Sequence, residues 1–169
     1  IHFPSLKLDT DGNWKYMLGD TVITDYTGLV EYGGDNYYVE NGVVNFNATT
    51  LVYFDDAWYY VENGTVNYNY TGLVDYYDGY YYVACGILDW DFTGIVEYYG
   101  NFYYVVNGVA DVSYTGVIEL NGETYHIVNG VLIAHVFSEW QVRKNVTCTE
   151  DGIEFRACSC GLEETKVIT

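Results

Sequence analysis

The sequence predicts an all-β protein: a β-hairpin repeat solenoid of 22-residue repeats, with a small cysteine-containing β element at the C-terminal end. Thr-Gly pairs, Tyr-Tyr-Val triplets and Asn-Gly pairs each recur every 22 residues. Tyr occurs 21 times and Pro and Met once each, a bias that favours strands over helices. Because a unit of this size cannot bury its own apolar face, the fixed period indicates copies stacked on their neighbours.

Five full copies occupy residues 27–136. In the first copy, three of residues 29–32 are aliphatic or aromatic and the segment predicts a strand, and residues 36–40 follow a glycine-rich turn as its hairpin partner. Asn41-Gly42 supplies the two positive-φ positions of a type I′ turn, and residues 43–46 lead to the next copy. The opening pairs of the five copies are Thr27-Gly28, Thr49-Thr50, Thr71-Gly72, Thr93-Gly94 and Thr115-Gly116.

The alternation of side chains along a strand assigns the two faces of each hairpin. Tyr37 and Val39 share one face, and the apolar character of position 39 in every copy marks this as the packed face. A further aromatic column, at Phe46, Tyr68 and Trp90, is expected to pack in the core.

Acidic residues recur at one register, which predicts a solvated row that keeps exposed strands from pairing between molecules. This row consists of Glu31, Asp75, Glu97 and Glu119. The alternative is a row of bound cations along these residues, although their spacing does not match a set of metal ligands. The formal charge of −18 repels nucleic acid and anionic membrane surfaces. The sequence contains no run of 18 or more apolar residues, so membrane insertion is not expected.

Residues 1–26 read as a degenerate N-terminal capping repeat, because end units of an array meet solvent on one face. Asp9 to Asn13 predicts a turn between two strands, since Gly12 comes too early for a calcium-binding loop of the EF-hand type.

The unit Gly-Leu-Val-x-Tyr-x-Gly-x-x-Tyr-Tyr-Val-x-Asn-Gly resembles the bacterial cell-wall-binding repeats, a family that includes choline-binding modules, glucan-binding repeats and the receptor-binding repeats of large clostridial toxins. The resemblance covers residues 27–136. It implies hairpins wound into a superhelical solenoid, with ligands held between neighbouring hairpins against aromatic side chains. It also implies a secreted bacterial protein associated with the cell surface.

The resemblance implies a ligand less directly. Choline-binding repeats have Gly-Trp where this sequence has Gly-Leu, Gly-Ile or Gly-Val, so one wall of a cation–π cage is missing from every copy. Sugar rings can stack on one or two aromatic faces, so a cell-wall or host-surface glycan is the expected partner. The ligand-binding residues expected on this reading are Trp58, Tyr60, Tyr80, Tyr82, Phe102 and Tyr104.

Two functions of different kinds remain. The first is a non-catalytic glycan-binding module that gains avidity from repetition. The second is a structural spacer or fibre-forming solenoid without a small-molecule ligand, in which the rings only pack and the chain self-associates. No nucleophile, phosphate-loop or metalloprotease motif occurs, and an acidic row offers no unique pair of carboxylates for glycoside hydrolysis, so no enzyme activity and no cofactor are expected.

Residues 137–169 leave the period and form a separate cysteine-containing module. It resembles a small His/Cys module that ends repeat arrays in secreted proteins, although Cys158-x-Cys160 is one residue shorter than the usual Cys-x-x-Cys. His135, Cys148, Cys158 and Cys160 could form a structural zinc site. An extracellular setting favours instead a disulfide from Cys148 to Cys158 or Cys160, and free thiols are the third alternative.

Overall fold

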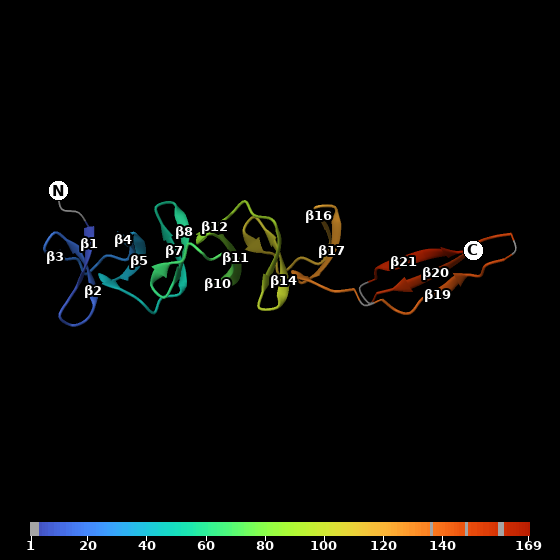
Figure 1. Ribbon diagram of the computed structural model, residues 1–169, viewed down its shortest axis with the longest axis horizontal. Helices are drawn as coiled ribbons and strands as arrows, with labels where there is room; N and C mark the ends of the chain where they lie inside the picture. Colours follow the sequence, from blue (N-terminus) through green and yellow to red (C-terminus); the bar gives the residue numbers. More distant parts are fainter. Residues whose placement is uncertain (1–3, 136, 148, 159–160) are drawn as a thin grey trace. The chain divides into compact units, whose positions relative to one another are not determined.

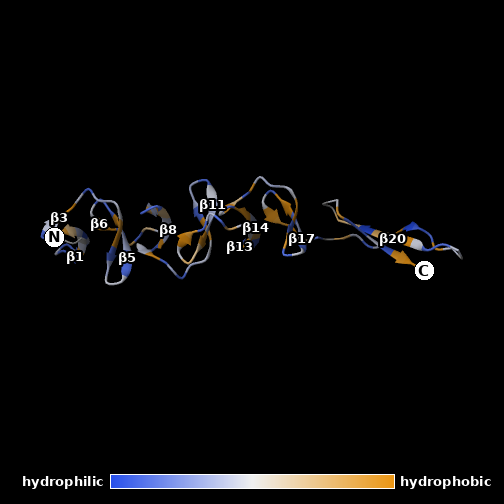
Figure 2. Ribbon diagram, turned by 90° about the horizontal axis from the view of Figure 1, so that it is seen from above, coloured by the Kyte–Doolittle hydropathy of each residue, from blue (hydrophilic) through white to orange (hydrophobic). Residues whose placement is uncertain are grey.

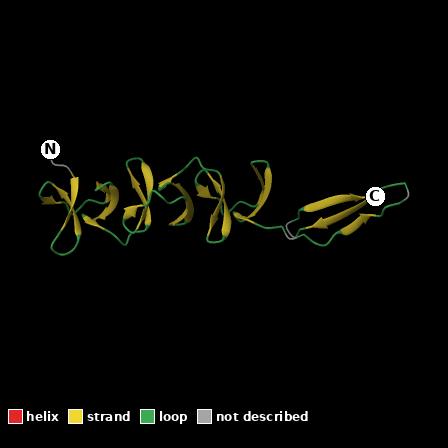
Figure 3. Cartoon of the chain, viewed as in Figure 1, coloured by secondary structure: helices red, strands yellow, loops and turns green. Residues whose placement is uncertain are grey.

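The computed structural model describes residues 4–135, 137–147, 149–158 and 161–169, which form strands, turns and loops (Figure 3). The chain divides into two compact units, Ile1–Leu132 and Ile133–Thr169. Across the described part of the chain, no helix is long and apolar enough to cross a membrane. The all-β repeat fold predicted from the sequence is confirmed, whereas the predicted ranges 1–26, 27–136 and 137–169 stay predictions.

The first unit is a series of antiparallel hairpins that follow one another in chain order (Figure 1). Each full copy has a five-residue strand, a six-residue strand and a two-residue strand. The hairpins are β1 (Pro4–Leu8) with β2 (Trp14–Leu18), β4 (Gly28–Tyr32) with β5 (Asp35–Glu40), β7 (Thr50–Phe54) with β8 (Ala57–Glu62), β10 (Gly72–Tyr76) with β11 (Gly79–Ala84), β13 (Gly94–Tyr98) with β14 (Asn101–Val106), and β16 (Gly116–Leu120) with β17 (Glu123–Val128).

The two-residue strands join successive copies. Except for the first of them, which has no preceding hairpin, each pairs with the second strand of its own hairpin and also with that of the preceding hairpin, as Val44 does with Val39 and Val43 with Lys15. The turn glycine adds to the junction, because the Gly64 carbonyl accepts a hydrogen bond from the Tyr38 N–H at 2.8 Å. These strands are β3 (Thr21–Val22), β6 (Val43–Val44), β9 (Thr65–Val66), β12 (Ile87–Leu88), β15 (Val109–Ala110) and β18 (Val131–Leu132).

The Asn-Gly turn adopts the predicted conformation, with φ of 50° at Asn41 and 76° at Gly42. Its glycine also lies against the chain of the preceding copy. A Cβ built on Gly86 would lie 2.6 Å from the Asn67 carbonyl oxygen and 2.9 Å from the Tyr68 Cα. Glycine is therefore required here for close approach as well as for φ.

The Thr of the opening Thr-Gly pair fixes this turn. In each copy its hydroxyl oxygen accepts a hydrogen bond from the backbone N–H found 14 residues later, so the start of each copy is tied to its own turn. The donor–acceptor pairs are Asn41–Thr27 (3.0 Å), Asn63–Thr49 (3.2 Å), Cys85–Thr71 (3.0 Å), Asn107–Thr93 (3.2 Å) and Asn129–Thr115 (3.0 Å).

The core is a chain of small clusters rather than one centre, as expected of an array. The predicted packed position 39 is confirmed, because Val39, Val61, Val83 and Val105 are 0% exposed and Ile127 is 1% exposed. Each cluster combines residues of two adjacent copies. For example, Leu51 packs with Val74 and Val83 of the next copy. Figure 2 shows apolar residues along the strands and polar residues at the turns. The four acidic residues of the predicted row are exposed, as expected.

Ion pairs stabilise the turn between β1 and β2. Lys15 forms ion pairs with Asp9 and, at 2.8 Å, with Asp11. The hydrogen bond from Lys15, followed by one from the Asn13 backbone, lowers the pKa of Asp11 from 3.8 to about 2.

Lys15→Met is expected to reduce the acid sensitivity of the array. Because the folded pKa of Asp11 is depressed, its stabilising contribution is present above the ordinary pKa of 3.8 and is lost as pH falls towards about 2. Melting temperatures measured at neutral pH and across this window should fall less for Lys15→Met than for the wild type. Lys7→Met is the control, and an equal acid loss in wild type and Lys15→Met would contradict the prediction.

The second unit contains a three-stranded antiparallel sheet of β19 (Gln141–Lys144), β20 (Gly152–Ala157) and β21 (Glu163–Ile168). Trp140 lies beneath two cations, with the Arg156 guanidinium carbon 4.9 Å and the Lys166 amine 4.3 Å from its ring centroid. Arg156 also pairs with Glu164 at 2.5 Å. Because the second unit is too small to bury a large core, these contacts contribute to its stability.

Candidate ligand-binding site

Four aromatic rings surround a cavity of about 100 Å³ between the third and fourth hairpins, which we call cage 3. Trp58 comes from β8, and Tyr76, Tyr81 and Trp90 come from the next copy. The interplanar angles are 66° for Trp58–Tyr76, 76° for Tyr76–Tyr81 and 84° for Tyr81–Trp90, with ring centroids 5.5–6.2 Å apart. Rings at such angles form adjacent walls of a box rather than a stack, and Leu51 and Leu88 complete the lining.

The same arrangement occurs between the first and second hairpins, as cage 1. Trp14, Tyr32, Tyr37 and Phe46 surround a cavity of about 140 Å³. Trp14 and Tyr32 lie with centroids 5.6 Å apart at 58°, and Tyr37 and Phe46 lie 6.3 Å apart at 81°. Leu6 and Val44 take the aliphatic positions.

The two cages use identical sequence offsets. From each Trp, the other rings lie 18, 23 and 32 residues further along the chain. The cages therefore arise from one geometrical rule applied to two junctions, two copies apart.

The other three junctions meet the rule only in part. At cage 2 the Trp position is Asn36, whose side-chain amide donates a hydrogen bond to the Tyr68 hydroxyl at 2.9 Å. At cage 4, Tyr80 contacts Tyr98 at 5.4 Å and Tyr103 at 5.3 Å, so three rings pack on one another, and Val112 takes the fourth position. At the fifth junction the Trp position is Phe102, which is 47% exposed.

The electrostatic setting favours cations. Residues 1–132 contain 18 Asp and Glu and, as bases, only Lys7 and Lys15, so they carry a formal charge of −16 of the chain's −18. A field of this sign raises the local concentration of cationic ligands and lowers that of anions. Burial, with a smaller contribution from Tyr77, raises the pKa of Tyr76, so this wall of cage 3 stays neutral at neutral pH.

The structure divides the six predicted ligand-binding residues into two columns. Trp58 lines cage 3, and Tyr80 and Phe102 hold the equivalent positions at the next two junctions. The other three pack on a ring ten residues later in the chain and reinforce each hairpin. These pairs are Tyr60–Tyr70 (centroids 4.5 Å apart), Tyr82–Phe92 (3.7 Å) and Tyr104–Tyr114 (5.2 Å).

Sequence reasoning missed most of the cage. The column of Phe46, Tyr68 and Trp90 was expected in the core, but these rings are 46%, 43% and 50% exposed, and Phe46 and Trp90 line cavities, so that expectation is wrong. Tyr81 lies in the column assigned to packing, and Tyr76 had no assigned role. The signal was present in the sequence as offsets of 18, 23 and 32 residues, because each cage takes rings from two copies.

The predicted zinc site and disulfide stay predictions. Cys148 and Cys160 lie outside the described residues, and among the residues that are described no group of three His, Cys, Asp or Glu side chains is arranged to hold a metal. Cys158 is buried, 7% exposed, and its N–H donates to the Leu162 carbonyl at 2.8 Å.

Tandem hairpins with ring-lined cavities at their junctions define a cell-wall-binding repeat protein. Comparison with known families agrees with the geometry. Residues 25–45, 47–67, 69–89 and 91–111 match the choline-binding repeat, and the chain belongs to this family. No curated protein matches the chain significantly.

Proposed function

We propose that the repeat array is a non-catalytic module that attaches to a bacterial cell wall by holding choline groups in cages 1 and 3. The observation that supports this proposal most directly is the lining of cage 3 by four aromatic rings from two hairpins. A quaternary ammonium has no N–H to donate, so neutral ring faces suit it better than carboxylates or carbonyls do. Each ring contributes about 0.5 to 2 kcal/mol to such a cation.

The missing Gly-Trp wall does not weigh against choline in these cages. Leu51 occupies the position of that Trp, and the rings of Tyr76 and Trp90 enclose the same cavity. Enclosure is thus provided by the following copy. The sequence-based expectation favoured a glycan because one cage wall is missing from every copy, and it did not assign Tyr76 or Trp90 to the cage.

The charge and the repetition support a surface role. A unit with a formal charge of −16 favours a cationic group over a bare phosphate, and two cages on one chain bind neighbouring cholines of a polymer with an avidity that exceeds either affinity. The family match points to the choline of cell-wall teichoic acids as the source. We accordingly place the protein outside the cell, at a bacterial surface.

Isothermal titration of the whole chain with choline chloride tests this function. Binding of two cholines per chain is expected, one for each four-ring cage. Tetramethylammonium should compete and ammonium should not, because only the former presents methyl groups to the rings. Absence of choline binding at tens of millimolar would favour the spacer function instead.

Asn36→Trp is expected to add a third choline site. Cage 2 already has rings at Phe54, Tyr59 and Tyr68 at the same offsets, and Asn36 stands where cages 1 and 3 have Trp. The titration should then reach three cholines per chain. Asn36→Leu removes the same hydrogen bond to Tyr68 without adding a ring, and a third site in that variant would show that ring number is not the determinant.

A further inference from the structure

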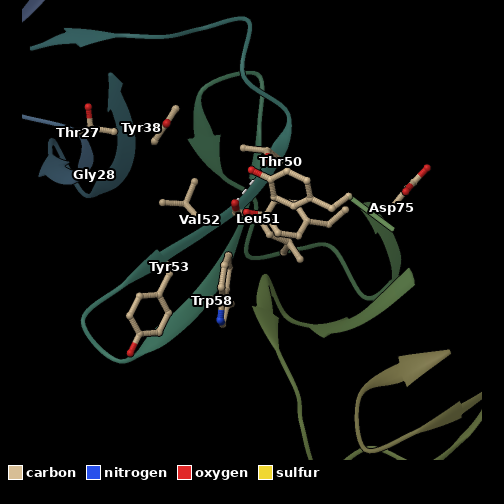
Figure 4. Close-up of a pocket in the computed structure, with 11 residues that line it drawn as sticks. Thr27, Gly28, Tyr38, Thr50, Leu51, Val52, Tyr53, Trp58 and Asp75 are labelled. Atoms are coloured by element: carbon tan, nitrogen blue, oxygen red, sulfur yellow. Dashed lines mark hydrogen bonds between the residues drawn. The ribbon is translucent and has the colours of Figure 1, made fainter. Parts of the chain in front are cut away.

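A larger cleft of about 540 Å³ adjoins cage 3. It takes residues from three successive hairpins. Tyr38 comes from β5, Thr50 and Tyr53 from β7, and Asp75 from β10, as Figure 4 shows. Tyr77, from the turn of the same hairpin as Asp75, also lines the cleft. Leu51, Trp58 and Tyr76 line both the cleft and cage 3, so the two are neighbours.

Two matched departures from the repeat create this cleft. At the other ring pairs, a Tyr of the second strand packs on a ring ten residues later, as Tyr16 does on Tyr26 with centroids 4.3 Å apart. Position 48 is Ala, so the face of Tyr38 has no such cover. Two residues later, Thr50 stands in place of the usual Gly, and the two changes are linked, because a Cβ on Gly28 would lie 2.9 Å from the Tyr26 hydroxyl oxygen. Removing the ring makes room for a threonine hydroxyl at the cleft.

Tyr77 stands at a turn position where the fold does not require an aromatic residue. It sits at the tip of the β10–β11 hairpin with φ of 53° and is 88% exposed. Three of the equivalent tip residues, Gly33, Asp55 and Asn121, are types that tolerate this left-handed conformation, whereas Tyr77 and the fourth equivalent, Tyr99, carry a bulky side chain that is strained there. The Tyr77 ring stands against Tyr76 at 4.5 Å and 79°, so a wall of cage 3 continues into the cleft. Tyr77 lines this cleft and Tyr99 does not, so position in the cleft distinguishes the two exposed rings.

The chemistry of the lining fits a neutral sugar. Tyr38, Tyr53 and Tyr77 supply aromatic rings on which the C–H face of a pyranose can stack, and Thr50 and Asp75 supply a hydroxyl and a carboxylate that can hydrogen-bond to its hydroxyl groups. A volume of about 540 Å³ lies within the range of small-ligand sites, roughly 300–1,000 Å³. The negative charge of the unit disfavours an anion in this cleft.

We propose that this cleft is a saccharide subsite, which binds a neutral pyranose next to the choline held in cage 3. The inference rests on the proposed choline function for its orientation, and it assigns Tyr77 as a specificity-determining residue. The cage would select the ammonium group, and the cleft would select a neutral sugar of the same polymer.

Three titrations of the whole chain test the subsite: with choline chloride, with purified choline-bearing teichoic acid, and with the same polymer after removal of its phosphocholine. Tyr77→Asn should bind choline with an affinity within twofold of the wild type and should bind both polymers about tenfold more weakly, because one stacking face is lost. Asn is compatible with the turn, as Asn121 with φ of 52° shows, so the melting temperature should not fall.

Tyr99→Asn is the matched control. Tyr99 has the same turn position, a φ of 49° and 87% exposure, but does not line this cleft, so its replacement should leave all three affinities within twofold. Equal polymer binding by wild type and Tyr77→Asn, or an equal loss in Tyr99→Asn, would overturn the subsite. If choline alone fails to bind while the choline-free polymer binds through Tyr77, the cage function is wrong and the saccharide subsite stands.

Discussion

Replacing Trp58 with alanine is expected to abolish choline binding at cage 3 and to leave cage 1 intact. Trp58 is the one ring that the third hairpin contributes to this cage, so its removal opens the cavity to water on that side as well as deleting a ring. Loss of the cation–π contribution alone, about 0.5 to 2 kcal/mol, weakens binding by roughly two- to thirtyfold. The added loss of enclosure should bring the site below detection at millimolar choline.

The measurement is the stoichiometry of the choline titration, which should fall from two to one. Tyr80→Ala is the matched control, because Tyr80 occupies the same position at cage 4, where three rings pack on one another, and its loss should leave two sites. Trp58 also packs against the cluster of Leu51, Val74 and Val83, so the melting temperature of each variant should be measured alongside. Two remaining sites in a folded Trp58→Ala variant would rule out cage 3.

Gly86→Ala is expected to destabilise the array far more than Gly100→Ala. The two glycines share a left-handed conformation, with φ of 78° and 80°, so each substitution carries a similar backbone strain of about 1–2 kcal/mol. They differ in surroundings. A Cβ on Gly86 would lie 2.6 Å from the Asn67 carbonyl oxygen, whereas a Cβ on Gly100 meets nothing within 4 Å. Forcing atoms into a packed junction costs about 1–3 kcal/mol more.

Urea unfolding monitored by tyrosine and tryptophan fluorescence gives this comparison. The free energies of unfolding of the two variants should differ by about 1–3 kcal/mol. Because both variants carry a similar backbone strain, this difference reports the steric cost of the close contact between two copies. Since each unit depends on its neighbours, Gly86→Ala should also broaden the transition by uncoupling the array near its middle. Equal stabilities would mean that the turn glycine serves φ alone.

The period made the fold predictable, and the cage was harder to derive for a physical reason. Turn chemistry at Asn41-Gly42 and the apolar residue at position 39 depend on neighbours within one copy, and both predictions are confirmed. The cage joins Trp58 to rings of the next copy, so it depends on how far one hairpin shifts past another. That shift is fixed by the backbone pairing of the two-residue strands, as at Ile87 with Tyr59, which the side-chain pattern does not encode.

Face assignment failed at the adjacent tyrosines for a related reason. Alternation predicts one packed and one outer face, but Tyr37 packs with the cluster of Val39 and Tyr38 packs with that of Leu29, so both faces meet a neighbour. In a sheet with one solvated face the alternation would have separated binding rings from structural ones. Here only the missing partner at Ala48 distinguishes Tyr38 from Tyr60, Tyr82 and Tyr104.

The pairing of each two-residue strand with two hairpins has an evolutionary consequence. A tandem duplication of one 22-residue unit inserts a complete hydrogen-bonded joint, and a compartment for a ligand is created in the same event. Later substitutions at a few aromatic positions can then create or remove ligand binding in that compartment without changing the compartments of the other copies. Lineages could thus vary the length of the protein and its number of attachment points independently.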